Sequence, residues 1–254
     1  MRFGVCADIN RASEIYKAGY DFIECTVISL VPDDDRQFSE LFHQYKESPV
    51  PIEACNVFLP GNLKIVGDSV DEDSIRTYLE KALPRVKKIG ADTVVFGSGG
   101  ARTLPIGFER SRGEEQIVQF LNLVADYADD LELTVVIEPL NRKESNIINS
   151  VTEGLEFVNK VNRPSIKLLA DFYHMDEENE SLVNIVVSKE HIRHIHVADT
   201  GRLAPGTGHY PYEQFVNTLS TANYDGRISI ECSWDDFERE SVAALQYLRD
   251  TFSK

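Results

Sequence analysis

The 254-residue chain has few positive charges: 26 Lys and Arg residues stand against 42 Asp and Glu residues, a formal net charge of −16. Phosphate binding needs concentrated Lys and Arg, so this balance argues against a nucleic-acid partner. The chain also lacks an apolar run near the roughly 20 residues that span a bilayer, and it shows no apolar core of a signal peptide. We therefore expect a cytoplasmic protein with no membrane partner.

Cysteine is sparse, and the four residues show no Cys-x-x-Cys spacing: Cys6, Cys25, Cys55 and Cys232. A disulfide framework is therefore not expected, and a thiolate-held metal cluster is disfavoured because cysteine is among the most buried residue types. Linkers rich in Pro, Gly or Ser are absent too, and no shift in composition divides the chain. Residues 1–254 are predicted to form a single domain.

The chain instead contains short apolar runs that alternate with amphipathic stretches. Eight runs are predicted as strands: Phe3–Cys6, Phe22–Val27, Ile52–Phe58, Thr93–Phe96, Leu133–Ile137, Ile166–Ala170, Ile192–Val197 and Arg227–Ile230. Apolar residues at three- and four-residue spacing predict helices at Ile75–Ile89, Glu114–Leu131, Val151–Val161, Tyr212–Leu219 and Val242–Phe252. Each unit takes about 32 residues, the size of one strand–helix–strand step. The pattern predicts an α/β fold, a single (β/α)8 TIM barrel.

Polar side chains end the last four predicted strands: Glu138, Asp171, His196 and Glu231. A carboxylate at the end of an apolar strand costs several kcal/mol when unpaired, so each needs compensation. One divalent cation would compensate all three negative charges, and oxygen ligands with one imidazole suit Mn²⁺, Mg²⁺, Co²⁺ or Zn²⁺. Alternatively, each residue caps a helix or pairs with Arg142, Arg193 or Arg202.

Four segments of the second half carry a family resemblance: Ile137–Glu144, Ala170–Met175, His194–Arg202 and Ser229–Glu231. They resemble the signature segments of the xylose-isomerase-like sugar isomerases and epimerases. The similarity is closest to ketose 3-epimerases of the tagatose/psicose type and to hydroxypyruvate isomerase. In the first half only the strand pattern resembles the family.

This resemblance implies that Glu138, Asp171, His196 and Glu231 hold one divalent ion, with Mn²⁺ as the first choice. It also implies that Glu138 and Glu231 are the catalytic acid–base pair on opposite faces of the reacting carbon. The remaining implied substrate contacts are Glu144, His174 and Arg202. In such a site a metal polarises the ketose carbonyl and steadies a cis-enediolate while carboxylates move the proton. The expected function is a metal-dependent isomerase acting on a small sugar, most closely a ketose 3-epimerase.

Other activities are open on the same scaffold. Hydroxypyruvate isomerase or an inosose dehydratase-like lyase would use the same metal site, and a non-catalytic sugar-binding barrel is disfavoured because the residue set is complete. An AP endonuclease would need additional His and Asp ligands after the third and fourth strands, where this chain has Cys55-Asn56 and Gly97-Ser98. The substrate, its phosphorylation or acidity, and a homodimeric or homotetrameric state stay open.

Several polar residues near strand ends have two readings each. His194 shares a strand face with His196 and is predicted to support it or pack in the core. Asp199 either orients a ligand histidine or caps the following loop. Glu24 either reaches the substrate or is neutralised by a nearby Arg or Lys.

The segment Gly97–Arg102 resembles an anion cradle, with backbone N–H groups and an Arg beside them. On that reading Arg102 holds a substrate carboxylate, phosphate or hydroxyl. On the alternative reading the segment is a flexible hinge of a lid. Cys6, Cys55 and Asn56 are predicted to be packing residues at the barrel mouth.

Overall fold

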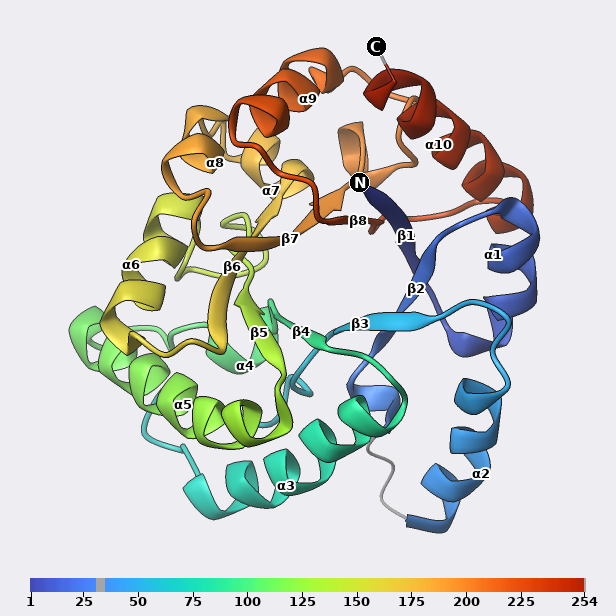
Figure 1. The fold of residues 1–254 in the computed structure, drawn as a ribbon. Coiled ribbons are helices and arrows are strands. Elements are labelled where there is room, and N and C mark those ends of the chain that lie inside the picture. The colour runs from blue at the N-terminus through green and yellow to red at the C-terminus, as the bar shows by residue number, and fades with distance from the viewer. Residues whose placement is uncertain (31–34, 254) are drawn as a thin grey trace.

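A closed barrel of eight parallel strands in sequence order forms the centre of the protein, and helices surround it (Figure 1). The computed structural model describes residues 1–30 and 35–253. β1 pairs with β8 to close the ring, with Phe3 opposite Ile228. The strands are β1 (Arg2–Cys6), β2 (Phe22–Thr26), β3 (Ile52–Asn56), β4 (Thr93–Phe96), β5 (Thr134–Ile137), β6 (Ile166–Asp171), β7 (Ile192–Val197) and β8 (Arg227–Ile230). The predicted (β/α)8 fold is confirmed, and each predicted strand coincides with an observed one.

The helices form the outer layer of the barrel (Figure 1). They are α1 (Ala12–Ala18), α2 (Asp35–Lys46), α3 (Glu72–Lys88), α4 (Gly99–Arg102), α5 (Arg110–Leu131), α6 (Val151–Val161), α7 (Phe172–Glu177), α8 (Val183–Val187), α9 (Tyr212–Thr221) and α10 (Phe237–Phe252). Three short 3-10 turns are η1 (Ile9–Arg11), η2 (Ile28–Leu30) and η3 (Thr200–Arg202). The five predicted helices are confirmed. None of the described helices is both long and apolar enough to cross a membrane.

Side-chain caps explain why α3 and α10 begin before the predicted helices. α10 begins at Phe237 because the Asp236 carboxylate accepts a hydrogen bond from the backbone N–H of Arg239. α3 begins at Glu72 because the Asp71 carboxylate accepts from two backbone N–H groups of the first turn. A polar N-cap satisfies donors that have no intrahelical partner, so the helix extends beyond its apolar stripe.

The barrel interior is divided into an apolar and a polar half. On β4, β5 and β6, Val95, Val136 and Leu169 form a small fully buried cluster, separate from the large core between strands and helices. Across from them, Glu24 of β2 is hydrogen-bonded to His194 of β7. Because β2 and β7 are not neighbours in the sheet, that bond crosses the interior. We call the first group the apolar half and the second the polar half.

Candidate metal centre and active site

The four predicted metal ligands converge at the carboxyl ends of β5 to β8. Glu138, Asp171, His196 and Glu231 each offer one ligand atom, and these atoms all lie within 4.8 Å of one another. His196 Nδ1 is 3.0 Å from an oxygen of Glu138 and 3.6 Å from one of Glu231. The strand ends of a parallel barrel open at one face, so four successive strands bring these polar groups together.

Neighbouring backbone shapes the positions of two of these carboxylates. A Cβ at Gly97, directly after β4, would lie 2.1 Å from Glu138 Oε2. Only a residue without a side chain therefore leaves room for Glu138. Asp171 caps α7, and its Oδ1 accepts from the backbone N–H groups of Tyr173 and His174 at 2.7 and 3.3 Å. This pair of bonds fixes the orientation of the carboxylate.

Burial and mutual repulsion set the charges of the cluster. Burial, with a contribution from Glu231, raises the pKa of Asp171 to about 6, and both causes also raise the pKa of Glu138. Burial opposes ionisation of Glu231 as well, but His196 and Arg202 lower the pKa of its carboxyl to about 2. Burial and repulsion therefore disfavour the charged forms of Asp171 and Glu138, and a cation bound between the carboxylates would offset both effects.

The side chains fit a divalent cation in both chemistry and space. Three carboxylates and one imidazole are ligands typical of Mn²⁺, Mg²⁺, Co²⁺ or Zn²⁺, without a thiolate. The gap at Gly97 makes room for the Glu138 carboxylate, which is one of the four residues of the group. The possible ligand groups among the described residues contain no residue of β3 or β4. The trinuclear site of an AP endonuclease would need additional ligands at the ends of those two strands.

His174 presents a buried hydrogen-bond donor without a partner beside the cluster. Its Nδ1 accepts from the backbone N–H of Asn141 at 3.2 Å, so the ring proton lies on Nε2. Nε2 is buried, has no hydrogen-bond partner, and lies 3.7 Å from Asp171 Oδ2. Burial lowers the pKa of His174, which keeps the ring neutral near pH 7. A buried N–H left in this way is a site for a ligand oxygen.

Arg202 links two further predicted residues across the mouth of the barrel. Its guanidinium donates to Glu144 at 2.9 Å and to Glu231 at 2.7 Å. Arg202 has a backbone φ of 62°, a left-handed conformation that a non-glycine residue adopts at a cost. The Asp199 carboxylate stabilises this loop by accepting from the backbone N–H groups of Thr200, Gly206 and Tyr210. Of its two readings, Asp199 therefore follows the loop-capping one.

Two asparagines that contact the site were missed or misread in the sequence. Asn56, predicted to be a packing residue, ends β3 and donates through Nδ2 to Glu231 Oε1 at 2.8 Å. Asn141 contacts both His174 Nδ1 and Glu144 Oε1 through its side-chain amide. Asn56 carried the same signal as the four predicted ligands, a polar residue at the end of an apolar strand. Applied to all eight strands, that signal includes it.

Of the two readings of Gly97–Arg102, the one in which Arg102 contacts a substrate anion is wrong. Residues 99–102 form the short helix α4, and the Arg102 side chain is completely buried. Its guanidinium donates to the backbone carbonyls of Phe96 at 3.0 Å and Glu138 at 2.7 Å. These carbonyls lie at the ends of two adjacent strands, where the buried guanidinium supplies hydrogen-bond donors; the Phe96 carbonyl also accepts from the backbone N–H of Glu138 at 3.1 Å. Arg102 joins β4 to β5 and faces no substrate.

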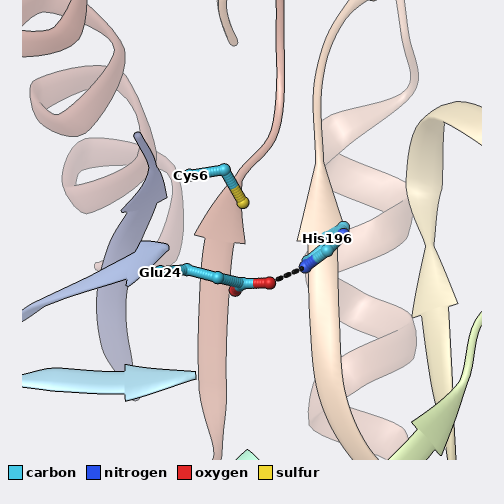
Figure 2. Close-up of side chains that lie close together, drawn as sticks. All are labelled: Cys6, Glu24 and His196. Atoms are coloured by element: carbon cyan, nitrogen blue, oxygen red, sulfur yellow. Dashed lines mark hydrogen bonds and ion pairs between the residues drawn. The ribbon is translucent and has the colours of Figure 1, made fainter. Parts of the chain in front are cut away.

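The partner of Glu24 also differs from the sequence-based expectation. Glu24 contacts no Arg or Lys within the described residues, and its fully buried carboxylate bonds to His194 and His196 instead. Cys6, Glu24 and His196 form a second group with ligand atoms within 4.8 Å (Figure 2). Burial and the Glu24 charge raise the pKa of the Cys6 thiol well above its usual value, so the sulfur is protonated when no ion is bound.

Comparisons with known proteins show the family and the fold of this chain. Residues 12–251 match the family model described as xylose isomerase-like TIM barrel. The chain is 26% identical to D-psicose 3-epimerase of Agrobacterium fabrum (strain C58) over 229 residues, 86% of this chain and 76% of that protein. It is 28% identical to L-ribulose 3-epimerase of Methylomonas sp. (strain DH-1) over 222 residues, 85% of this chain and 74% of that one. A crystal structure of D-psicose 3-epimerase in the presence of D-fructose superposes over both whole chains with a TM-score of 0.86 at 20% identity, which shows the shared fold.

Proposed function

The chain belongs to the xylose isomerase-like TIM barrel family, and from that premise we propose that it is a divalent-metal-dependent sugar epimerase of the ketose 3-epimerase type. The convergence of Glu138, Asp171, His196 and Glu231 at one barrel mouth carries this proposal. The epimerases among its relatives support the substrate class, a small ketose. Mn²⁺ is the proposed ion, held by these four side chains. A cytoplasmic location and a dimeric or tetrameric state stay predictions.

The ion, when bound, supplies Lewis-acid polarisation of a substrate carbonyl. Glu138 and Glu231 move the proton at the carbon next to that carbonyl: one carboxylate removes it from one face, and the other returns a proton to the opposite face. They extend from β5 and β8, three strands apart around the ring, which suits groups on two sides of one substrate. A positioned acid–base pair contributes about 10²–10⁴-fold.

Three further side chains hold the sugar in this proposal. His174 donates its free Nε2–H to a substrate oxygen, because that proton has no partner inside the protein. Arg202 and Glu144 form an ion pair at the mouth, with exposed fractions of 28% and 35%, and contact hydroxyl groups there. Held between these groups, the sugar presents one carbon to both carboxylates. Binding in this orientation makes proton transfer between the carboxylates and the sugar effectively unimolecular.

Solvent deuterium exchange tests the proposal. With Mn²⁺ in D₂O, the protein should label a ketose at carbon three, and an aldose–ketose isomerase would label carbon one instead. A dehydratase would produce a new ultraviolet-absorbing compound, and a binding protein would do neither. A panel of free and phosphorylated ketoses with no labelling at any carbon would contradict the proposal.

Glu231→Gln should lower this exchange by about 10²–10⁴-fold, because the amide cannot carry the proton. Glu156→Gln, on the exposed surface of α6, removes the same charge and should exchange like the wild type. Labelling by Glu231→Gln at the wild-type rate would refute the assigned role of Glu231. Circular dichroism of both variants checks that the barrel is intact.

A further inference from the structure

The buried carboxylate of Glu24, on β2, makes three hydrogen bonds that the proposed reaction does not use. It is completely buried in the barrel interior. It accepts from His194 Nε2 at 2.8 Å, from His196 Nε2 at 3.0 Å and from Ser229 Oγ at 2.6 Å. The two bonds from His194 and Ser229 hold one oxygen of Glu24, which leaves the other oxygen, Oε1, for His196. A carboxylate with this many donors is fixed in one orientation.

His196 is held between two carboxylates through its two ring nitrogens. Nε2 faces Glu24, as Figure 2 shows, and Nδ1 faces Glu138 at 3.0 Å. Because a carboxylate only accepts hydrogen bonds, the contact with Glu24 requires the ring proton on Nε2. By the same rule, the 3.0 Å contact of Nδ1 with Glu138 requires a proton on Nδ1, so both ring nitrogens donate in this arrangement. An ion bound among Glu138, Asp171 and Glu231 would take the place of the Nδ1 proton, while Glu24 keeps the Nε2 proton. The ring is also fully buried, so water does not compete for Nε2.

We propose that Glu24 is the positioning residue for His196: it accepts the Nε2–H and so directs the Nδ1 lone pair toward the metal ion. This inference rests on the proposed metal site. Partners of this kind orient a ligand histidine, fix its tautomer and raise its basicity, and their loss typically costs 10–100-fold in metal affinity. His194 and Ser229 in turn hold Glu24, so the polar half of the interior is one connected support for a single ligand.

A second ion held by Cys6, Glu24 and His196 is the competing explanation for this group. It is disfavoured because both oxygens of Glu24 already accept hydrogen bonds, and an ion would replace the one from His196. The two explanations differ in what Cys6 does. Under the positioning role Cys6 binds nothing, and a single Mn²⁺ binds per chain.

Mn²⁺ titration of the full-length protein, followed by the electron paramagnetic resonance signal of the free ion, tests the role without using activity. Glu24→Gln keeps the size of the side chain but presents an N–H₂ group where Glu24 presents an acceptor. We expect a 10–100-fold larger Kd for Mn²⁺. Cys6→Ser and Val136→Ala, which leave the Glu24–His196 bond intact, should bind Mn²⁺ as the wild type does.

Glu24→Asp separates positioning from charge, since it keeps the carboxylate but withdraws it by one methylene. A weakened affinity for this variant supports positioning, and wild-type affinity overturns it, because charge alone would then suffice. Wild-type affinity in Glu24→Gln overturns it too. Weaker binding by Cys6→Ser would overturn it in favour of a second ion. If the wild type itself binds no Mn²⁺, the proposed function fails first, so the two failures are distinguishable.

Melting of the metal-free proteins checks that the variants are folded. Val136→Ala removes two buried methyl groups from the apolar half and is expected to lower the melting temperature without changing Kd. Glu24→Gln must change Kd at a temperature where the variant is fully folded. A Kd change that scales with lost stability in both variants would assign Glu24 a merely structural role and overturn the proposal.

Discussion

The two halves of the barrel interior solve the problem of burial in different ways. Val95, Val136 and Leu169 fill the apolar half with side chains that need no partner. In the polar half, a fully buried carboxylate needs three donors from β7 and β8 before it can be accommodated. Apolar packing tolerates substitutions of similar volume, whereas a buried charge tolerates loss of its partners poorly.

The contrast between the apolar and the polar half assigns stability mainly to one half and orientation of the metal ligand to the other. Apolar contacts are non-directional, so they stabilise the ring without orienting any group at its mouth. Hydrogen bonds are directional, so the network of Glu24 controls how His196 is presented. The apolar half should therefore determine the free energy of unfolding, and the polar half the affinity for the ion. Each of the following predictions tests that separation.

The largest expected effect is on stability. Leu169→Ala should lower the free energy of unfolding by about 2–5 kcal/mol, because it removes buried methyl groups and leaves a cavity. Leu169 lies opposite His194 in the register of β6 and β7, at the boundary of the two halves. Urea unfolding of the metal-free protein measures the loss. An accompanying change of more than threefold in the Kd for Mn²⁺ would break the separation.

Metal binding should give the next largest effect. At a free Mn²⁺ concentration of about one hundred times Kd, the free energy of unfolding should rise by about 2.7 kcal/mol, because the ion binds only the folded barrel. Removal of the ion with a chelator should reverse the change. Leu169→Ala should gain the same increment, which calorimetry can measure. A smaller gain in that variant would mean that the apolar half contributes to the metal site.

The smallest effect is expected at Gly97, where the end of β4 borders the site. Gly97 follows β4 and makes room for Glu138. Gly97→Ala should displace that carboxylate and raise the Kd for Mn²⁺ about tenfold, which corresponds to about 1.4 kcal/mol. Gly61→Ala, where a Cβ meets only ordinary contacts, is the matched control. Equal affinities for both variants would show that Glu138 adapts without the gap.

Much of the candidate site was open to prediction because it follows from strand order. Glu138, Asp171, His196 and Glu231 each follow or end an apolar run, and a parallel barrel gathers such ends at one face. Their identity as ligands, like the roles of Glu144, His174 and Arg202, stays a prediction that the described geometry supports. Asn56 is also a polar residue at the end of an apolar strand, β3, so the same pattern could have placed it at the site.

For Arg102, the local sequence pattern predicted the wrong contacts. Its segment, Gly97–Arg102, with three glycines and an Arg after a strand, had the composition of an anion-binding loop. The side chain instead turns inward, where its guanidinium donates to the carbonyls of Phe96 and Glu138 at two strand ends. A local pattern describes which groups a loop contains, but it does not tell toward which side of the backbone they point.

By itself, the amino-acid order determined the alternation of strands and helices, the barrel, and the four strand ends that carry ligand-type side chains, since each depends on local periodicity. Only the folded arrangement decided that Glu24 serves His196, that Asn56 contacts Glu231 and that Arg202 joins Glu144 to Glu231. Those contacts connect residues between 29 and 175 positions apart. They exist because ring closure brings non-neighbouring strands across one interior, and no local pattern records which side chains meet there.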